Sequence, residues 1–180
     1  QVESIEIMKG AASTLYGSGA ATAVINITLK KAAKKTIEAN GYWNLGTYNT
    51  ASTSKKEPQD YNQGFSIGGS LKKFNYLATL NSTETSGMSQ IAEPNENVTY
   101  EEDRFSRINY LAKMGYKATD KLTLDFFGSY DKINNDYDGS FDNTGKNDIT
   151  QNQSDSKQFR AGFLPKYKYN NGEFVLNSSY

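Results

Sequence analysis

Hydrophobic and polar residues alternate one by one along several segments of the chain, and this period of two restricts the fold more than any other feature. In the segment 122–131, Leu122, Leu124 and Phe126 alternate with Thr123 and Asp125. Because successive side chains of a β-strand point to opposite faces, such a segment is predicted to be a strand with one apolar and one polar face. The same alternation occurs at 37–47, 65–72, 76–81, 107–117 and 159–168, and a further segment begins at Phe174. The sequence therefore predicts an all-β sheet of about seven strands.

The connections between the predicted strands are alternately long and short. Long polar stretches occupy 50–62, 86–104 and 134–156, whereas tight turns are predicted at 72–75, 118–121 and 170–172. Transmembrane barrels of the bacterial outer membrane sort their connections in this way, with short turns at one end and long loops at the other. A soluble β-sandwich has no reason to do so.

The length of the predicted strands favours the same fold. Strands of roughly ten residues exceed the usual 5–6 and suit a tilted strand of about 9–11 residues that crosses a bilayer. In a barrel the apolar face would meet lipid and the polar face would meet the lumen. The polar face carries Glu38, Asn40, Arg107, Lys113, Asp125, Arg160 and Lys166. We therefore predict that residues 32–180 form part of a transmembrane antiparallel β-barrel, which about seven strands leave incomplete.

The composition excludes several kinds of chemistry. The chain has no Cys and no His, so thiolate metal sites and imidazole bases are excluded within it. Its 20 basic and 20 acidic residues give no general attraction to nucleic acid. Aspartates gather in one predicted loop, but they lack the spacing of an EF-hand and are expected to be a solvated acidic surface. Since no nucleophile–base set stands out either, we expect neither an enzyme nor a cofactor or metal site.

The first 31 residues follow a different pattern. A strand is predicted at 4–8, where Ile5 and Ile7 share one face. An Ala-rich stretch at 11–16 could form a short helix that ends at Gly17. Residues 23–29 read AVINITL, which is a β-branched strand. Residues 1–31 are therefore predicted to form a strand, a short helix and a second strand, and the lysines at 30–35 mark a boundary.

The residues between these two predicted strands form an ordered motif. The chain reads KGAASTLYGSGA from Lys9 to Ala20, and VINI follows at 24–27. This order resembles the junction between plug and barrel in TonB-dependent receptors, whose pattern is near KGPASxLYGxGA followed by GGVINI. The motif residues singled out here are Lys9, Gly10, Ser13, Leu15, Tyr16, Gly17, Gly19, Val24 and Asn26. Ala11 replaces the usual Pro, and Thr22–Ala23 replaces the Gly-Gly pair. The siderophore and cobalamin branch of the family fits better than the glycan branch.

The resemblance implies both an architecture and a function. Residues 1–31 would be the C-terminal end of an α+β plug domain, and residues 32–180 would begin the barrel. The protein would lie in the outer membrane of a bacterial cell, in contact with outer-membrane lipid. It would import a scarce ligand, above all a ferric siderophore, with energy from the inner-membrane TonB complex. That complex would act through a segment upstream of residue 1, so we expect the chain to be a segment of a longer protein.

Other functions remain open at this point. The same class of transporter could carry cobalamin, a glycan or a peptide. A passive porin-like or structural outer-membrane barrel, or a soluble β-sandwich adhesion module, would also use alternating strands. The sequence does not indicate which residues bind the ligand.

Overall fold

The computed structural model describes residues 2–10, 22–30, 33–48, 57–86, 102–138 and 151–180. The chain divides into two compact units, residues 1–32 and 33–180. Within the described ranges, no helix has the length and apolar character needed to cross a membrane.

The first unit is a two-stranded antiparallel ribbon of β1 (Val2–Lys9) and β2 (Ala23–Leu29). The register runs from Lys9 opposite Ala23 to Val2 opposite Leu29, with an irregularity between Val2 and Ser4. Both strands that the sequence predicted here are confirmed. The short helix predicted at 11–16 lies outside the described residues.

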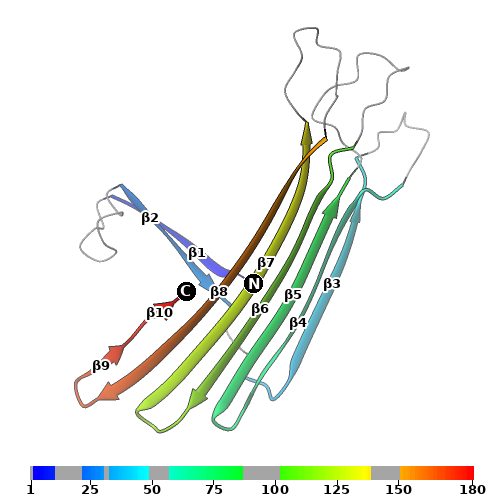
Figure 1. Ribbon diagram of the computed structural model, residues 1–180. Coiled ribbons are helices and arrows are strands. Elements are labelled where there is room, and N and C mark those ends of the chain that lie inside the picture. The colour runs from blue at the N-terminus through cyan, green and yellow to red at the C-terminus, as the bar shows by residue number, and fades with distance from the viewer. Residues whose placement is uncertain (1, 11–21, 31–32, 49–56, 87–101, 139–150) are drawn as a thin grey trace, which may run out of the picture. The chain divides into compact units, whose positions relative to one another are not determined.

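The second unit is one antiparallel sheet whose strands lie in chain order (Figure 1). The short turns lie at one end of the sheet, and the strand ends that lead into the long connections lie at the other (Figure 1). The long strands are β3 (Glu38–Gly46), β4 (Asp60–Leu71), β5 (Phe74–Thr85), β6 (Phe105–Lys117), β7 (Leu122–Asp138) and β8 (Gln151–Tyr169). Sequential pairing through tight turns is the arrangement expected of the wall of an up-and-down barrel. The predicted fold class is therefore confirmed.

A seventh strand is present but interrupted. The segments β9 (Gly172–Val175) and β10 (Ser178–Ser179) both pair with β8. Their registers are continuous, because Val175 faces Lys166 and Ser178 faces Phe163. Between them the amide of Leu176 donates to the carbonyl of Pro165, at 3.1 Å. Pro165 has no amide hydrogen to donate in return, so the ladder loses a bond and the seventh strand is interrupted at this point.

The alternation of long and short connections is confirmed, but the bounds of two long connections are wrong. The connection predicted at 50–62 lies between β3 and β4 at 47–59, because residues 60–62 already pair within β4. The turns at 72–73, 118–121 and 170–171 and the long connection at 86–104 lie where predicted. The connection predicted at 134–156 is instead only 139–150, because β7 and β8 continue well past their apolar parts. Apart from Tyr137, the extensions carry polar side chains, so no hydrophobic period marks them, yet cross-strand pairing continues to Asp138 opposite Gln151.

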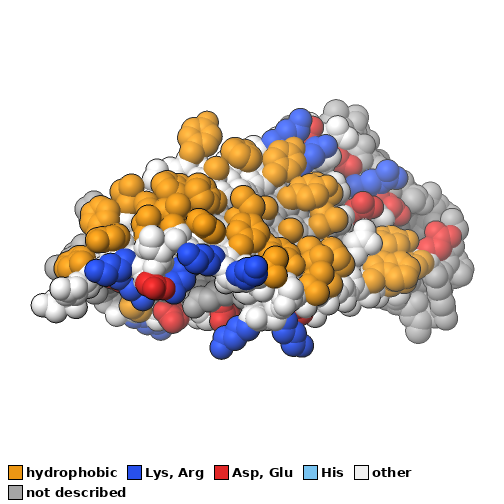
Figure 2. All heavy atoms as spheres, turned by 90° about the horizontal axis from the view of Figure 1, so that it is seen from below, with side chains coloured by type: hydrophobic (Ala, Val, Ile, Leu, Met, Phe, Trp, Pro, Cys, Tyr) orange, Lys and Arg blue, Asp and Glu red, His pale blue; other side chains and the backbone are white. Residues whose placement is uncertain are grey.

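The two faces of the sheet differ sharply in chemistry. Successive partners across β5 to β8 include Tyr76, Met114, Phe126 and Phe163, and all of these lie on one face. Several large apolar side chains of this face are 40–60% exposed, including Met114 at 51%. Figure 2 shows hydrophobic side chains gathered over a broad area, with charged side chains at its margins. We call this the outward face. Among described residues Leu111, on the opposite or inward face, is the single buried large hydrophobic.

Candidate functional site

The inward face carries the polar side chains that the sequence assigned to the lumen. The registers place all seven of them on this one face, as predicted. One row runs across the strands through Asn81, Asn109 and Asp131. At the edge of this row, the Tyr42 hydroxyl donates to Asn81 Oδ1 at 3.3 Å. The inward face is therefore a wall of hydrogen-bonding groups, suited to a hydrated or protein-filled interior.

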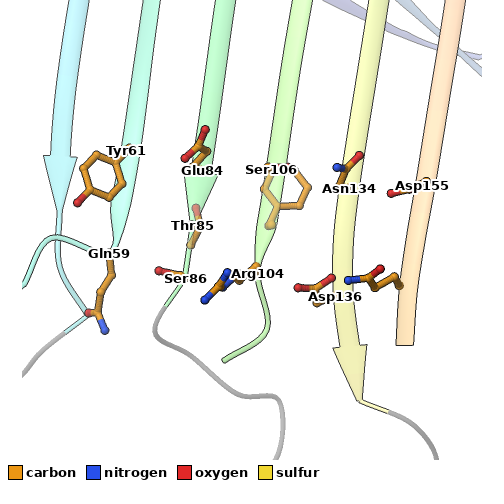
Figure 3. Close-up of a pocket in the computed structure, with 12 residues that line it drawn as sticks. Gln59, Tyr61, Glu84, Thr85, Ser86, Arg104, Ser106, Asn134, Asp136 and Asp155 are labelled. Atoms are coloured by element: carbon orange, nitrogen blue, oxygen red, sulfur yellow. The ribbon is translucent and has the colours of Figure 1, made fainter. Parts of the chain in front are cut away.

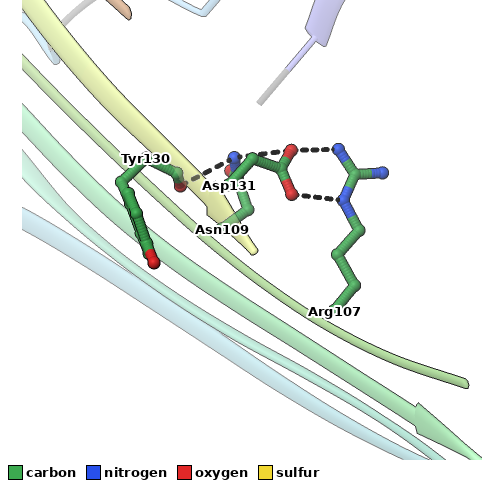
Figure 4. Close-up of polar contacts among 4 residues, drawn as sticks. All are labelled: Arg107, Asn109, Tyr130 and Asp131. Carbon is green, nitrogen blue, oxygen red and sulfur yellow. Dashed lines mark hydrogen bonds and ion pairs between the residues drawn. The ribbon is translucent and has the colours of Figure 1, made fainter. Parts of the chain in front are cut away.

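A charged cluster links β6 and β7 on this face (Figure 4). Arg107 Nε donates to Asp131 Oδ1 at 2.9 Å, and its Nη2 donates to the other carboxylate oxygen. Asn109 Nδ2 donates to Asp131 Oδ2 at 3.3 Å and to the Tyr130 carbonyl at 3.4 Å. The Asp131 side chain is 5% exposed, whereas that of Arg107 is 49% exposed. Since a buried carboxylate is costly without partners, these donors are what allows Asp131 to remain charged there.

A second inward contact is steric. Phe127 on β7 lies directly opposite Gly162 on β8. A Cβ built on Gly162 would overlap the Phe127 ring, so the ring occupies the space that any larger residue would need. The close approach of ring and backbone fills the inward surface without a large residue on β8.

A polar groove of about 550 Å³ lies where β4 to β8 approach the long connections (Figure 3). It contains the carboxylates Glu84, Asp136 and Asp155 and one cation, Arg104. The registers place the three carboxylates on the outward face, beyond its apolar part. Sequence reasoning missed this groove, because it is built largely from the polar strand extensions. The signal available was that 134–138 and 152–156 are polar apart from Tyr137. Most of its lining residues are polar, although Tyr61 and Phe105 also border it.

The turn at the opposite end is held by its own side chains. Thr119 Oγ1 accepts hydrogen bonds from the amides of Lys121, at 3.2 Å, and Leu122, at 3.0 Å. Lys117 Nζ lies 2.9 Å from Asp120 Oδ1. The hydrogen bond and charge of this ammonium hold the pKa of the Asp120 carboxyl below its ordinary value.

The predicted plug-motif residues are only partly described. Lys9 ends β1, and Val24 and Asn26 lie on β2 opposite Met8 and Glu6. Asn26 Nδ2 donates to Glu6 Oε2 at 3.1 Å. The other motif residues, Ser13, Leu15, Tyr16, Gly17 and Gly19, lie outside the described residues. The role of the motif in a plug stays a prediction.

Gly10 follows β1 with a φ of +113°, which L side chains rarely adopt. Its amide donates to the Thr22 carbonyl at 2.9 Å and so adds one bond beyond the last strand pair. A glycine at this point of the motif therefore has a backbone reason.

The described residues include no group of three or more acidic, His or Cys side chains placed to hold a metal ion. The sequence did not indicate which residues bind a ligand. The structure adds two candidate surfaces, the inward polar rows and the outward groove.

Comparison with known proteins supplies a context for these surfaces. No family model matches the chain. It is 36% identical over 72 residues to a probable TonB-dependent siderophore receptor, PirA, of Acinetobacter baumannii. It is 37% identical over 71 residues to the ferric enterobactin receptor of Pseudomonas aeruginosa. These matches cover 40% and 39% of the chain, which spans 9% of the length of each relative.

Solved structures extend the likeness in fold. Two crystal structures of mutants of the Pseudomonas aeruginosa ferric enterobactin receptor, PfeA, match 97% of the chain with TM-scores of 0.68 and 0.69. The second holds enterobactin. Both are 18% identical to the chain, which covers 26% and 27% of them. The resemblance indicated by the motif is thus confirmed: in sequence and in fold, the chain is similar to a segment of the TonB-dependent siderophore receptors.

Proposed function

We propose that the full-length protein imports a ferric siderophore across the bacterial outer membrane, with energy supplied through TonB. The observation that carries the proposal is the combination of a fold that matches a ferric enterobactin receptor structure over 97% of the chain with sequence similarity to two siderophore receptors. The motif at 9–27 agrees with it. Neither relative is named as an enzyme, and we propose a transporter without a catalytic site.

The two faces of the sheet would have different roles in import. The apolar outward face would contact membrane lipid, and the polar inward face would surround the plug and the passage. The long connections would face the cell exterior, where a ligand arrives. The TonB complex would contact a plug segment that lies upstream of this chain.

Uptake of iron-55 bound to enterobactin tests the proposal, because enterobactin is the ligand named for one relative. In a strain that lacks the gene and is grown under iron limitation, uptake should fall, and the full-length gene should restore it. A proton uncoupler should abolish the restored uptake. Unchanged uptake in the deletion strain would contradict the siderophore proposal.

Two other outcomes separate the remaining functions. Restored uptake that survives the uncoupler would favour a passive porin-like barrel. Loss of labelled cobalamin, glycan or peptide uptake, with siderophore uptake intact, would assign the other cargo to the same class of transporter.

A further inference from the structure

Two lysines lie directly opposite each other on the outward face of the sheet. Lys132 on β7 and Lys157 on β8 are cross-strand partners. Among the ion pairs between described residues, neither lysine takes part. Like charges placed directly opposite destabilise a sheet, so the pair needs a counter-charge. The nearest carboxylate on the same strand and face is Asp155, two residues before Lys157.

The position of the pair relative to the apolar surface is specific. The next row toward the short turns contains Tyr110, Tyr130 and Phe159, which are successive partners on the outward face. The rings of Tyr110 and Tyr130 lie 6.4 Å apart, and Phe159 is 61% exposed. Aromatic side chains of this kind form the girdle at the boundary between hydrocarbon and head groups. The lysines lie one row beyond it, on the side of the long connections.

The surface beside Lys132 is hollowed. A cavity of about 180 Å³ is bordered by Lys132 together with Ser82, Ser106, Ile108 and Asn134, and also by Arg107 and Glu84. The hydroxyls of Ser82 and Ser106 can donate hydrogen bonds to a ligand in this cavity. Ile108, directly opposite Lys132, adds an apolar side chain. Glu84 lies one row farther from the girdle than Lys132.

We propose that Lys132 and Lys157 bind the phosphate of an anionic lipid in the outer leaflet. A phosphate between the two ammonium groups supplies the missing counter-charge, and its acyl chains lie along the apolar outward face below. The continuity of the basic pair with this lipid-facing surface selects a lipid rather than a soluble anion. The inference requires the barrel-wall fold and does not depend on which cargo is imported.

Binding of fluorescent dioleoyl phosphatidic acid to the full-length protein in zwitterionic detergent tests the proposal. Dioleoyl phosphatidylcholine is the comparison lipid. The wild type should prefer phosphatidic acid, and Lys132→Gln and Lys157→Gln should each weaken that binding roughly five-fold, since one basic residue near an anionic lipid surface contributes on the order of 1 kcal/mol. The variant with arginine at both positions should retain the preference.

Matched controls and rival outcomes complete the experiment. Lys72→Gln with Lys121→Gln removes two charges from short turns at the other end of the sheet, and should leave binding unchanged. The wild-type preference should also fall as salt rises from about 0.05 to about 0.5 M. If the variant that carries both Lys132→Gln and Lys157→Gln binds phosphatidic acid as tightly as the wild type, the proposal is overturned and Asp155 remains as the counter-charge. Displacement of the lipid by an equal concentration of inorganic phosphate also overturns it. Siderophore uptake is scored separately, so its failure would not affect this result.

Discussion

Arg107 on β6 reaches diagonally across the strand pair to Asp131 on β7, whose direct partner is Asn109. Two donors thus converge on a carboxylate that is almost fully buried on the inward face. Because each donor comes from β6 and the acceptor from β7, the cluster also fixes the register of these two strands.

Arg107→Ala should destabilise the folded barrel by about 1–3 kcal/mol, because it leaves a buried carboxylate with a hydrogen bond unmade. Guanidinium unfolding of the full-length protein in detergent measures the change. The double variant Arg107→Ala with Asp131→Asn is the control, since it removes the charge that needs the arginine. It should be more stable than the single variant, and equal stabilities would show that the pair is not coupled.

Gly162→Ala should destabilise the barrel by about 1–3 kcal/mol through overpacking against Phe127. Gly128→Ala is the matched control on the neighbouring strand, because a Cβ there meets no atom within 4 Å. The same unfolding experiment compares the two. Equal free energies of unfolding for Gly162→Ala and Gly128→Ala would contradict this prediction. They would show that the Phe127 ring can move aside and does not restrict the size of residue 162.

Gly10→Ala should strain the turn that follows β1, by about 1–3 kcal/mol for a side chain in a disfavoured region of φ. Limited proteolysis of the full-length protein, with cleavage sites mapped by mass spectrometry, should show faster cutting within residues 1–32. The control is Lys9→Ala, which changes an exposed neighbour at an ordinary strand position. This variant should be cut by the protease at the wild-type rate. Identical rates for all three proteins would remove the backbone reason for this motif glycine.

The pKa of Asp120 depends on Lys117, and the sign of the effect can be stated. The pKa of the carboxyl is lower in the folded chain than its ordinary value of 3.8. The contact therefore favours the folded state above the ordinary pKa and loses this contribution as pH falls through the lowered value. Lys117→Gln should raise the Asp120 pKa toward 3.8, followed by NMR of the labelled carboxyl carbon. The control Lys121→Gln, in the same turn, should leave the titration midpoint of Asp120 unchanged. Equal midpoints in the wild type and both variants would rule out the contact between Lys117 and Asp120.

Much of the fold could be predicted because a bilayer demands apolar side chains on one face only. Leu122, Leu124 and Phe126 therefore mark β7 in the sequence, and the tight turn at 118–121 sets which residues of β6 and β7 face each other. The Arg107–Asp131 contact follows from that register, although alternation alone does not select it among the inward polar residues.

The remaining features depend on pairing that hydrophobicity does not report. The extensions of β7 and β8 are polar apart from Tyr137, so their pairing beyond Asn134 leaves no hydrophobic period in the sequence. The outward groove is missed for the same reason. The sequence places Pro165 within a predicted strand. It does not indicate whether the missing amide hydrogen interrupts the pairing with β7 or with the seventh strand, because this depends on which neighbour the amide of residue 165 would face.

Ala112 lies in the middle of the outward apolar surface, between Ala78 on β5 and Gly128 on β7. If this surface contacts hydrocarbon, Ala112→Arg should reduce the folding stability of the full-length protein in lipid vesicles by about 2–4 kcal/mol. Ala112→Met adds a long side chain without charge and should be tolerated, since lipid accommodates its volume. A soluble sheet with this face in water would show the reverse order, with the arginine harmless. Unfolding by guanidinium from vesicles decides between these orders, and equal stabilities of the two variants would contradict a lipid-facing Ala112.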